Sequence, residues 1–320
     1  MINVELKGGA VKEFENGTTP AEIAKSIGAG LYKSVCCAKV DGDLCDLRTP
    51  LEKDCKVELL TFDNVDGQKT FWHTASHVLA QAVKRLYPNA KCAIGPAVDN
   101  GFYYDFDVEK PFSPEDLEKI KAEMNKIVKS GLELERVELS PEEAEKKLEE
   151  MNEPYKVELV KEHSDKGEHI TFYKQGEFID LCAGPHLMSV APIKAIELTA
   201  CTGAYWRGDA NNAQLCRVYG VAFPKASMLE EHLKKLEEAK LRDHNKLGRE
   251  LEYFTTVDYV GQGLPILLPK GARVVQLLQR WVEDVEQSKG CLLTKTPLLA
   301  KRDLYKISGH WDHYLDGMFV

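Results

Sequence analysis

The stretch Phe71–Tyr87, FWHTASHVLAQAVKRLY, has the periodicity of an amphipathic helix. At about 100° per residue its apolar side chains gather on one side. They are Phe71, Ala75, Val78, Leu79, Ala82, Val83 and Leu86. By the same spacing His73 and His77 fall within roughly 40° of each other on the opposite side. A lone helical histidine usually fills core or faces solvent, but these two share a face away from the apolar stripe and form a candidate site.

A second pair of chemically capable side chains follows much later in the chain. Cys182 and His186 stand in the run Cys182-Ala183-Gly184-Pro185-His186, a predicted turn after a predicted strand at 177–181. H-x-x-x-H on a helix and C-x-x-x-H after a strand supply four nitrogen and sulfur groups of the kind that bind zinc. Such a set could hold a metal or order an attacking water. The residue after His73 is Thr74 rather than the glutamate of H-E-x-x-H, which excludes the metalloprotease interpretation.

Two charged residues lie near this turn in the predicted secondary structure. Asp180 belongs to the strand at 177–181, and Lys156 to another predicted strand at 155–160. Together they could bind a carbonyl, a water or a ribose hydroxyl. By themselves, such residues are more often surface charges.

Composition limits the class of protein. The chain has 320 residues, 43% hydrophobic and 29% charged, with no apolar run near the roughly 18 residues that span a bilayer. The N-terminus has no signal-peptide pattern, so we expect a cytosolic protein without membrane contact. Nine cysteines without a C-x-x-C pair encode neither a disulfide framework nor a zinc ribbon. A net charge of −9 argues against a generic nucleic-acid coat, and the acidic excess at 113–168 suggests a solvated helical surface.

Helix starts, turns and strand patterns along the chain predict four segments of an α+β multidomain fold. Residues 1–62 combine a helix starting at Thr19-Pro20 and stopping at Gly28 with a hairpin and a closing strand, which suggests a β-grasp module. Residues 63–224 hold the candidate site, a strand after Asn100 on which Tyr103 and Tyr104 face opposite ways, and helices at 113–130 and 140–151. Residues 225–247 predict one long linker helix.

The last segment, 248–320, predicts a helix at 272–288 followed by a strand at 291–299. Val274, Leu278, Trp281 and Val285 are expected to face inward, and Pro297 favours an edge or interface position for the strand. The chain stops at Asp316-Gly317-Met318-Phe319-Val320 without a capping element, so this domain is expected to be truncated.

Four motifs together resemble the bacterial threonyl-tRNA synthetases. They are His73-Thr74-Ala75-Ser76-His77; Gly95-Pro96 with Asn100-Gly101-Phe102-Tyr103-Tyr104-Asp105; Asp180-Leu181-Cys182-Ala183-Gly184-Pro185-His186; and Gly203-Ala204-Tyr205-Trp206-Arg207-Gly208-Asp209-Ala210-Asn211-Asn212. The resemblance is collinear over the whole chain. It implies a TGS domain, an editing domain shared with alanyl-tRNA synthetases whose second additional domain lies near 170–220, a linker helix, and the start of a class II catalytic core. Residues 272–299 resemble class II motif 1, which implies a homodimer interface that includes Pro297.

The resemblance also implies a reaction and the residues that perform it. The family attaches threonine to its tRNA using ATP, Mg²⁺ and a zinc ion, and clears mischarged seryl-tRNA by hydrolysis. It implies that His73, His77, Lys156, Asp180 and Cys182 are the editing residues, that His186 completes the pocket, and that Gly95 and Tyr104 line the substrate site. The ATP-binding arginines and core zinc ligands of the family are not found within residues 1–320, so ligation is expected to be absent from this chain.

Several alternatives stay open at this stage. The alanyl branch is zinc-associated, whereas the threonyl branch is described as working with water alone, so we expect no obligatory metal on His73, His77, Cys182 and His186. The chain could also be a freestanding trans-editing deacylase, although such a protein has no reason to keep motif 1. A noncatalytic tRNA-binding or regulatory paralogue is the third hypothesis, and the intact editing residues weigh against it.

Overall fold

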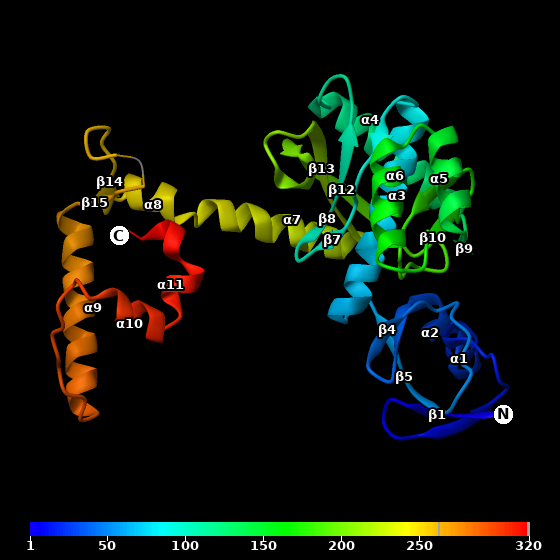
Figure 1. Cartoon of the computed structure of the whole chain (residues 1–320), viewed down its shortest axis with the longest axis horizontal. Helices are drawn as coiled ribbons and strands as arrows, with labels where there is room; N and C mark the ends of the chain where they lie inside the picture. The colour runs from blue at the N-terminus through cyan, green and yellow to red at the C-terminus, as the bar shows by residue number, and fades with distance from the viewer. Residues whose placement is uncertain (262, 319–320) are drawn as a thin grey trace. The chain divides into compact units, whose positions relative to one another are not determined.

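The computed structural model describes residues 1–261 and 263–318 and divides into two compact units, Met1–Leu236 and Glu237–Val320 (Figure 1). Phe319 and Val320, the last residues of the expected truncated domain, lie outside the described residues. Within the described ranges, no helix combines the length and the apolar character needed to cross a membrane.

The first 62 residues, here called the N-terminal module, form a mixed five-stranded sheet in the order β2-β1-β5-β3-β4. Its strands are β1 (Ile2–Leu6), β2 (Val11–Phe14), β3 (Val35–Val40), β4 (Asp43–Cys45) and β5 (Cys55–Thr61). Helix α1 (Pro20–Ile27) begins at the predicted Thr19 cap, whose side chain and Glu22 form a capping box. Gly28 ends α1 as expected, but a second short helix that the sequence did not predict follows, α2 (Ala29–Ser34).

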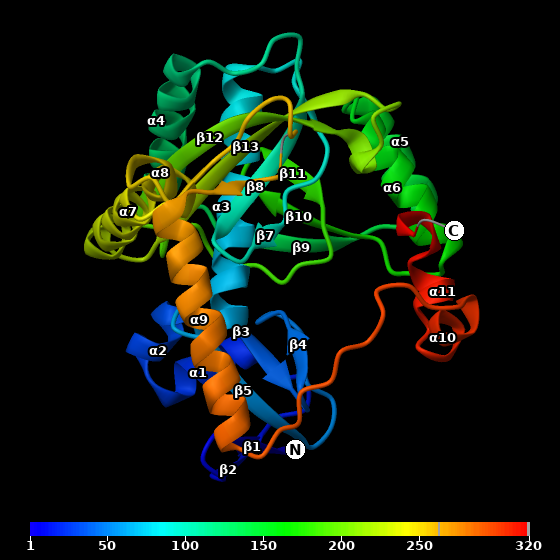
Figure 2. The same ribbon diagram turned by 90° about the vertical axis from the view of Figure 1, so that its left-hand side faces the viewer.

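Residues 63–224, here called the central module, are built around helix α3 (Val65–Leu86). A sheet runs in the order β12 (Ala195–Tyr205), β13 (Gln214–Phe223), β8 (Gly101–Asp107), β6 (Lys91–Cys92), and β7 (Ala97–Val98) also pairs with β8. Helices α3 and α4 (Pro114–Ser130) pack against this sheet (Figure 2). Strand alternation sends Tyr104 into the core and leaves Tyr103 on the other face, under the Arg217 guanidinium, which confirms the predicted alternation.

A second, three-stranded sheet of the central module carries the loop of the candidate site. Its order is β11 (Phe178–Leu181), β10 (Thr171–Gln175), β9 (Leu134–Glu138), and helices α5 (Pro141–Glu150) and α6 (Pro154–Asp165) pack beside it. The predicted strand at 155–160 is wrong, because these residues lie in α6. Pro154 at the first helical position starts the helix, and Val157 and Val160 pack against the β10 side of the module.

The histidine face of α3 is buried as well as the apolar stripe. His77 is buried although it lies opposite the apolar stripe, and Thr74 and Ser76, which flank the stripe, are buried as well. The sheet covers one side of the helix, and the segment around His186 and Leu187 covers the other through Thr74. The helix is therefore enclosed on both faces, and its polar side is an interior site wall rather than a surface.

Residues beyond the central module form helices with few strands. Helix α7 (Ala226–Leu241) and helix α8 (His244–Glu250) replace the single predicted linker helix, because the Asp243 side chain caps a new helix start by accepting from the Lys246 amide. The second unit further contains β14 (Phe254–Thr255), β15 (Ile266–Leu267), α9 (Pro269–Ser288), α10 (Arg302–Ile307) and α11 (His310–His313).

Two expectations for the second unit are wrong. Residues 291–299 form no strand, since no neighbouring strand within the described residues pairs with them. Val274, Leu278, Trp281 and Val285 of α9 do not face inward but are exposed, with Trp281 at 62%. The helical periodicity was correct, but nothing described in this unit buries the apolar stripe.

Candidate active site

The four side chains singled out from the sequence meet in one place. Helix α3 presents His73 and His77, and the loop after β11 presents Cys182 and His186. One potential ligand atom from each lies within 4.8 Å of all the others. The Cys182 Sγ is 3.2 Å from the Nε2 of His73 and 3.2 Å from the Nε2 of His186. The helix pair and the loop pair therefore form one cluster.

The loop that carries Cys182 and His186 is shaped by close backbone contacts. The Cys182 amide donates to the Thr171 carbonyl, and the Gly184 amide donates to the Cys182 sulfur at 3.3 Å. Gly184 has φ +76°, and a Cβ there would lie 2.2 Å from the Tyr173 hydroxyl. Only glycine meets both conditions, so the loop can close onto Tyr173.

Hydrogen-bond accounting fixes the tautomer of His186. The Thr74 hydroxyl has one hydrogen, which it donates to the Thr70 carbonyl at 3.0 Å. The Nδ1 of His186, 3.2 Å from the Thr74 oxygen, must therefore be the donor in that contact. A neutral ring protonated at Nδ1 turns the lone pair of Nε2 towards Cys182. The imidazole is thus aimed into the cluster as an acceptor or a ligand.

His77 is the least satisfied member of the cluster. Its Nδ1 is buried with no hydrogen-bond partner among the described residues, and its Nε2 is 3.7 Å from the Asp180 carboxylate. Its ring centroid lies 5.4 Å from that of His73 and 4.2 Å from that of His186. Since buried polar atoms are normally paired, this nitrogen is a position where a water, a substrate or an ion would find a partner.

Lys156 and Asp180 form a buried ion pair next to the histidines. The Lys156 Nζ lies 2.7 Å from the Asp180 Oδ1, and the Tyr104 hydroxyl donates to Oδ2 at 2.5 Å. Burial acts against both charges, but the Asp180 carboxylate raises the Lys156 pKa, and Lys156 with His77 lowers the Asp180 pKa. Both groups are therefore held ionised inside the module. The sequence prediction placed them near each other, but on two strands rather than on a helix and a strand.

Burial keeps two of the imidazoles neutral. It lowers the pKa of His73 to about 4, a shift that the Asp180 charge only partly offsets. It also lowers the pKa of His186 well below the ordinary value, with the neighbouring His77, His73 and Arg48 acting in the same direction. At neutral pH these two rings can accept protons or bind a metal rather than carry charge.

A cavity of about 330 Å³ opens onto this group. The predicted residues in its wall are His73, His77, Gly95, Lys156, Asp180 and Cys182. His186 is fully buried behind this wall. Tyr104, expected to line the substrate site, lies beneath it instead and reaches the cavity only through Asp180. A side chain on a buried face of β8 points into the core, which is why it supports the site rather than touching a substrate.

Gly95 is a close-packing position in the wall. A Cβ there would lie 2.1 Å from the Tyr104 ring, and the Gly95 carbonyl accepts from the Ser76 hydroxyl at 2.7 Å. The wall segment 93–96 is thereby held between β8 and α3. This explains in physical terms why glycine stands at the predicted pocket position.

The structure adds site residues that the sequence analysis missed. His163, Glu168 and His169 lie at the cavity, although the first two belong to the acidic stretch interpreted as a solvated surface. Asp46 of the N-terminal module also reaches the site by accepting from the His186 amide. No spacing signal could have linked residue 46 to residue 186. Pro297 belongs to the second unit and is exposed there.

Comparison with known proteins finds matches in both parts of the first unit. Residues 2–61 match the family described as the TGS domain, and residues 170–219 match the threonyl and alanyl tRNA synthetase second additional domain. A threonine–tRNA ligase of Clostridium perfringens is 59% identical over 320 residues, which are 100% of this chain and 49% of that protein. The chain is related to the threonine–tRNA ligases along its whole length.

Further threonine–tRNA ligases support the same relation. The protein of Clostridium botulinum is 58% identical over 320 residues, 100% of this chain and 49% of that protein. That of Acetivibrio thermocellus is 51% identical over 319 residues, 100% of this chain and 50% of that protein. The chain thus spans about half the length of the threonine–tRNA ligases that it matches. The expected TGS domain and second additional domain are both confirmed, and the latter contains Asp180, Cys182 and His186.

Proposed function

We propose that the central module hydrolyses the ester between serine and the 3′ end of threonine tRNA, as the editing part of a threonine–tRNA ligase. The observation that carries this proposal is the meeting of His73, His77, Cys182 and His186 at one cavity whose wall also holds the Lys156–Asp180 pair. The relation to threonine–tRNA ligases supplies the substrate class.

The need for such a site follows from the size of the error to be corrected. Serine lacks one methyl group of threonine, and a pocket discriminates a group of that size by only about 1–3 kcal/mol. Hydrolysis of the wrong ester in a second site supplies the remaining accuracy. Threonine would be excluded here sterically by the wall at 93–96, which Tyr104 supports from beneath.

Each polar group has a proposed role in the hydrolysis. A water molecule attacks the ester carbonyl and passes a proton to the neutral His73, while Lys156 stabilises the developing negative charge and the leaving ribose oxygen. Asp180 binds the substrate's ammonium group. His77, Cys182 and His186 shape the pocket and position the water.

The same residues fit a metal ion. The imidazoles of His73, His77 and His186 and the Cys182 sulfur form the donor set of a zinc site. When bound, zinc would lower the pKa of a water and polarise a carbonyl. We nevertheless infer that the hydrolysis has no obligatory metal, since Lys156 and a neutral His73 supply the proton and charge chemistry without one.

The wider protein would perform the ligation itself. We infer attachment of threonine to threonine tRNA with ATP, Mg²⁺ and a zinc ion at a site separate from the cavity described here, in a cytosolic homodimer. We assign the second unit, with α9 and Pro297, to the start of the class II core and its dimer interface. The freestanding deacylase remains the alternative with the same chemistry.

A deacylation assay tests the editing proposal. Protein treated with a chelator is expected to clear seryl-tRNA and spare threonyl-tRNA, and His73→Ala is expected to lower the rate by roughly 100-fold or more, a usual contribution of a general base. His244→Ala removes an exposed imidazole and serves as the matched control. Tight binding of tRNA without clearance of seryl-tRNA would instead support the noncatalytic binding protein.

A further inference from the structure

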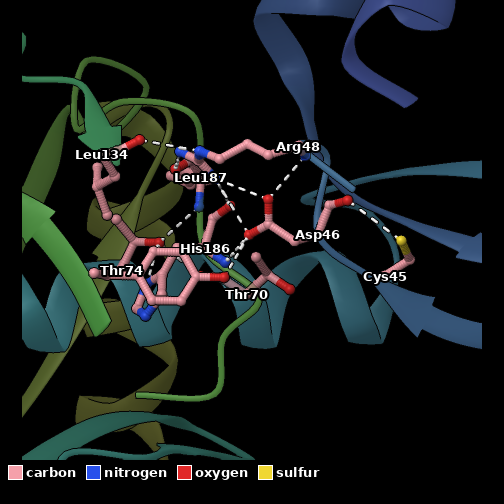
Figure 3. Close-up of polar contacts among 9 residues, drawn as sticks. Cys45, Asp46, Arg48, Thr70, Thr74, Leu134, His186 and Leu187 are labelled. Carbon is pink, nitrogen blue, oxygen red and sulfur yellow. Dashed lines mark hydrogen bonds and ion pairs between the residues drawn. The ribbon is translucent and has the colours of Figure 1, made fainter. Parts of the chain in front are cut away.

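Two side chains of the N-terminal module contact the backbone behind the wall of the candidate active site. Asp46 and Arg48 follow β4, and Figure 3 shows them reaching towards His186, Leu187 and Leu134 of the central module. Asp46 is 7% exposed, and the Arg48 side chain is 16% exposed. They are therefore interior groups of a junction between two parts of the chain far apart in sequence.

Asp46 works as a shared acceptor. Its Oδ2 accepts from the Tyr173 hydroxyl at 2.8 Å and from the His186 backbone amide at 3.2 Å. Its Oδ1 accepts from Arg48 Nη1 at 2.9 Å and from the Arg48 amide at 2.9 Å. Both carboxylate oxygens are fully used, which is what a buried charge requires.

Arg48 ties three backbone carbonyls together. Its Nη2 donates to the Leu187 carbonyl at 2.8 Å, its Nε to the Leu134 carbonyl at 3.0 Å, and its Nη1 contacts the His186 carbonyl at 3.4 Å. The planar guanidinium fork fixes the directions of these contacts, which a lysine could not reproduce. The segment after Cys182 is thereby fastened to the start of β9.

The path from this junction to the reacting groups is short. The His186 amide that Asp46 holds belongs to the same residue whose ring contacts Cys182 at 3.2 Å. The Tyr173 ring, held by its hydroxyl on Asp46, packs against the His186 imidazole with centroids 4.4 Å apart. Asp46 thus holds His186 from its backbone and from one face of its ring.

We propose that Asp46 and Arg48 are positioning residues of the editing reaction, so that the N-terminal module sets the shape of the Cys182–His186 loop. This inference rests on the proposed hydrolysis for its activity readout. A displacement of about 1 Å in a catalytic group can lower a rate by roughly 100-fold. The N-terminal module therefore contributes to catalysis without touching the substrate.

The decisive variant is Asp46→Asn in the full chain. The amide keeps the size of the carboxylate, but its oxygen can face either Tyr173 and His186 or Arg48, and its NH₂ then meets donors on the other side. We expect kcat for seryl-tRNA to fall roughly 10- to 100-fold with KM changed less than about twofold, as for residues that orient a site from behind. Arg48→Lys keeps the charge without the planar guanidinium. It is expected to lower kcat with little change in KM in the same way.

The control is Asp43→Asn, which removes an exposed carboxylate from β4 of the same module. A second readout is the ¹⁵N signature of the His186 ring, which should keep its Nδ1-protonated form in the control and shift or broaden in Asp46→Asn. If Asp46 acted only in stability, its loss would lower the melting temperature and leave kcat and the His186 ring signals of the folded protein unchanged.

The possible results distinguish a positioning role from a purely structural one and from failure of the proposed function. If folded Asp46→Asn and Arg48→Lys match the control in kcat and in the His186 signals, the positioning role is wrong. If Asp46→Asn is unstable, Arg48→Lys decides by the same two measurements. If the wild-type chain does not hydrolyse seryl-tRNA, the proposed function fails, while the ring signals still decide whether Asp46 positions His186.

Discussion

The Lys156 ammonium and the Asp180 carboxylate are each almost completely buried, at 4% and 3% exposure. Neither charge would be stable there alone, because breaking one partner out of a buried pair usually costs about 3–5 kcal/mol. The pair instead brings a permanent charge to the cavity wall beside imidazoles that burial keeps neutral. Thus Lys156 and Asp180 stay charged because they pair with each other, whereas the neighbouring imidazoles stay neutral and can accept protons.

The low pKa of His73 predicts the pH profile of the reaction. Because burial lowers this pKa to about 4, the ring stays neutral at pH 7 and remains an acceptor as the pH falls to about 5. We expect the His73-dependent part of seryl-tRNA hydrolysis to be level from about pH 5 to 7 and to be lost as the pH approaches 4.

The same shift predicts an effect on stability. The unfolded chain binds a proton to His73 below about pH 6.5, whereas the folded chain does so only near 4, so the stability contribution falls as the pH drops between these values. Single-turnover rates and melting curves of wild type and His73→Asn at each pH provide the measurement. A rate that falls at pH 6–7 through His73 would contradict the neutral-ring mechanism.

Among the elements, α6 shows how local pattern and packing compete. Residues 155–160 alternate polar and apolar side chains as a strand does, yet they form a helix that starts at Pro154. Burial of Val160 against the neighbouring α5 and β10 selects the helix. Lys156 then reaches Asp180 from a helix, which the strand prediction did not foresee.

Gly95 in the short connection between β6 and β7 gives a testable prediction about this element. Gly95→Ala places a Cβ 2.1 Å from the Tyr104 ring, so either the ring or the wall segment must move. We expect a loss of about 1–3 kcal/mol in the free energy of unfolding, typical of overpacking. We also expect a fall in seryl-tRNA hydrolysis, because Tyr104 supports Asp180.

Denaturant unfolding and the deacylation assay measure the two effects of Gly95→Ala. Gly30→Ala is the matched control, since nothing lies within 4 Å of its Cβ position and it occupies helix α2. An unchanged stability and rate in Gly95→Ala would show that the wall is not rigid.

At the scale of the whole molecule, the exposed stripe of α9 is the feature that the described residues leave unexplained. Its spacing places Val274, Leu278, Trp281 and Val285 on one side of the helix, and all four are exposed. An apolar stripe of this length is typical of an interface. It occurs in the segment that resembles motif 1, which is consistent with the proposed homodimer.

We therefore expect the chain to self-associate through α9. Leu278→Glu and Trp281→Glu are expected to shift the chain to monomer by at least tenfold in dissociation constant, because each places a charge in an apolar contact. Gln276→Glu adds the same charge on the opposite side of the helix and is the control. Sedimentation equilibrium gives the masses, and a monomeric wild type at high micromolar concentration would refute the interface.

The sequence by itself determined which chemical groups are available and most of the elements that carry them. The periodicity of Phe71–Tyr87 put His73 and His77 on one face, and the turn at Cys182–His186 supplied the other two groups, because these patterns are local. Tertiary structure alone decided that Lys156 comes from a helix, that Tyr104 supports the wall from beneath, and that Asp46 holds His186 across 140 residues. Burial, pKa and long-range hydrogen bonds depend on what packs around a group, and no spacing along the chain records those neighbours.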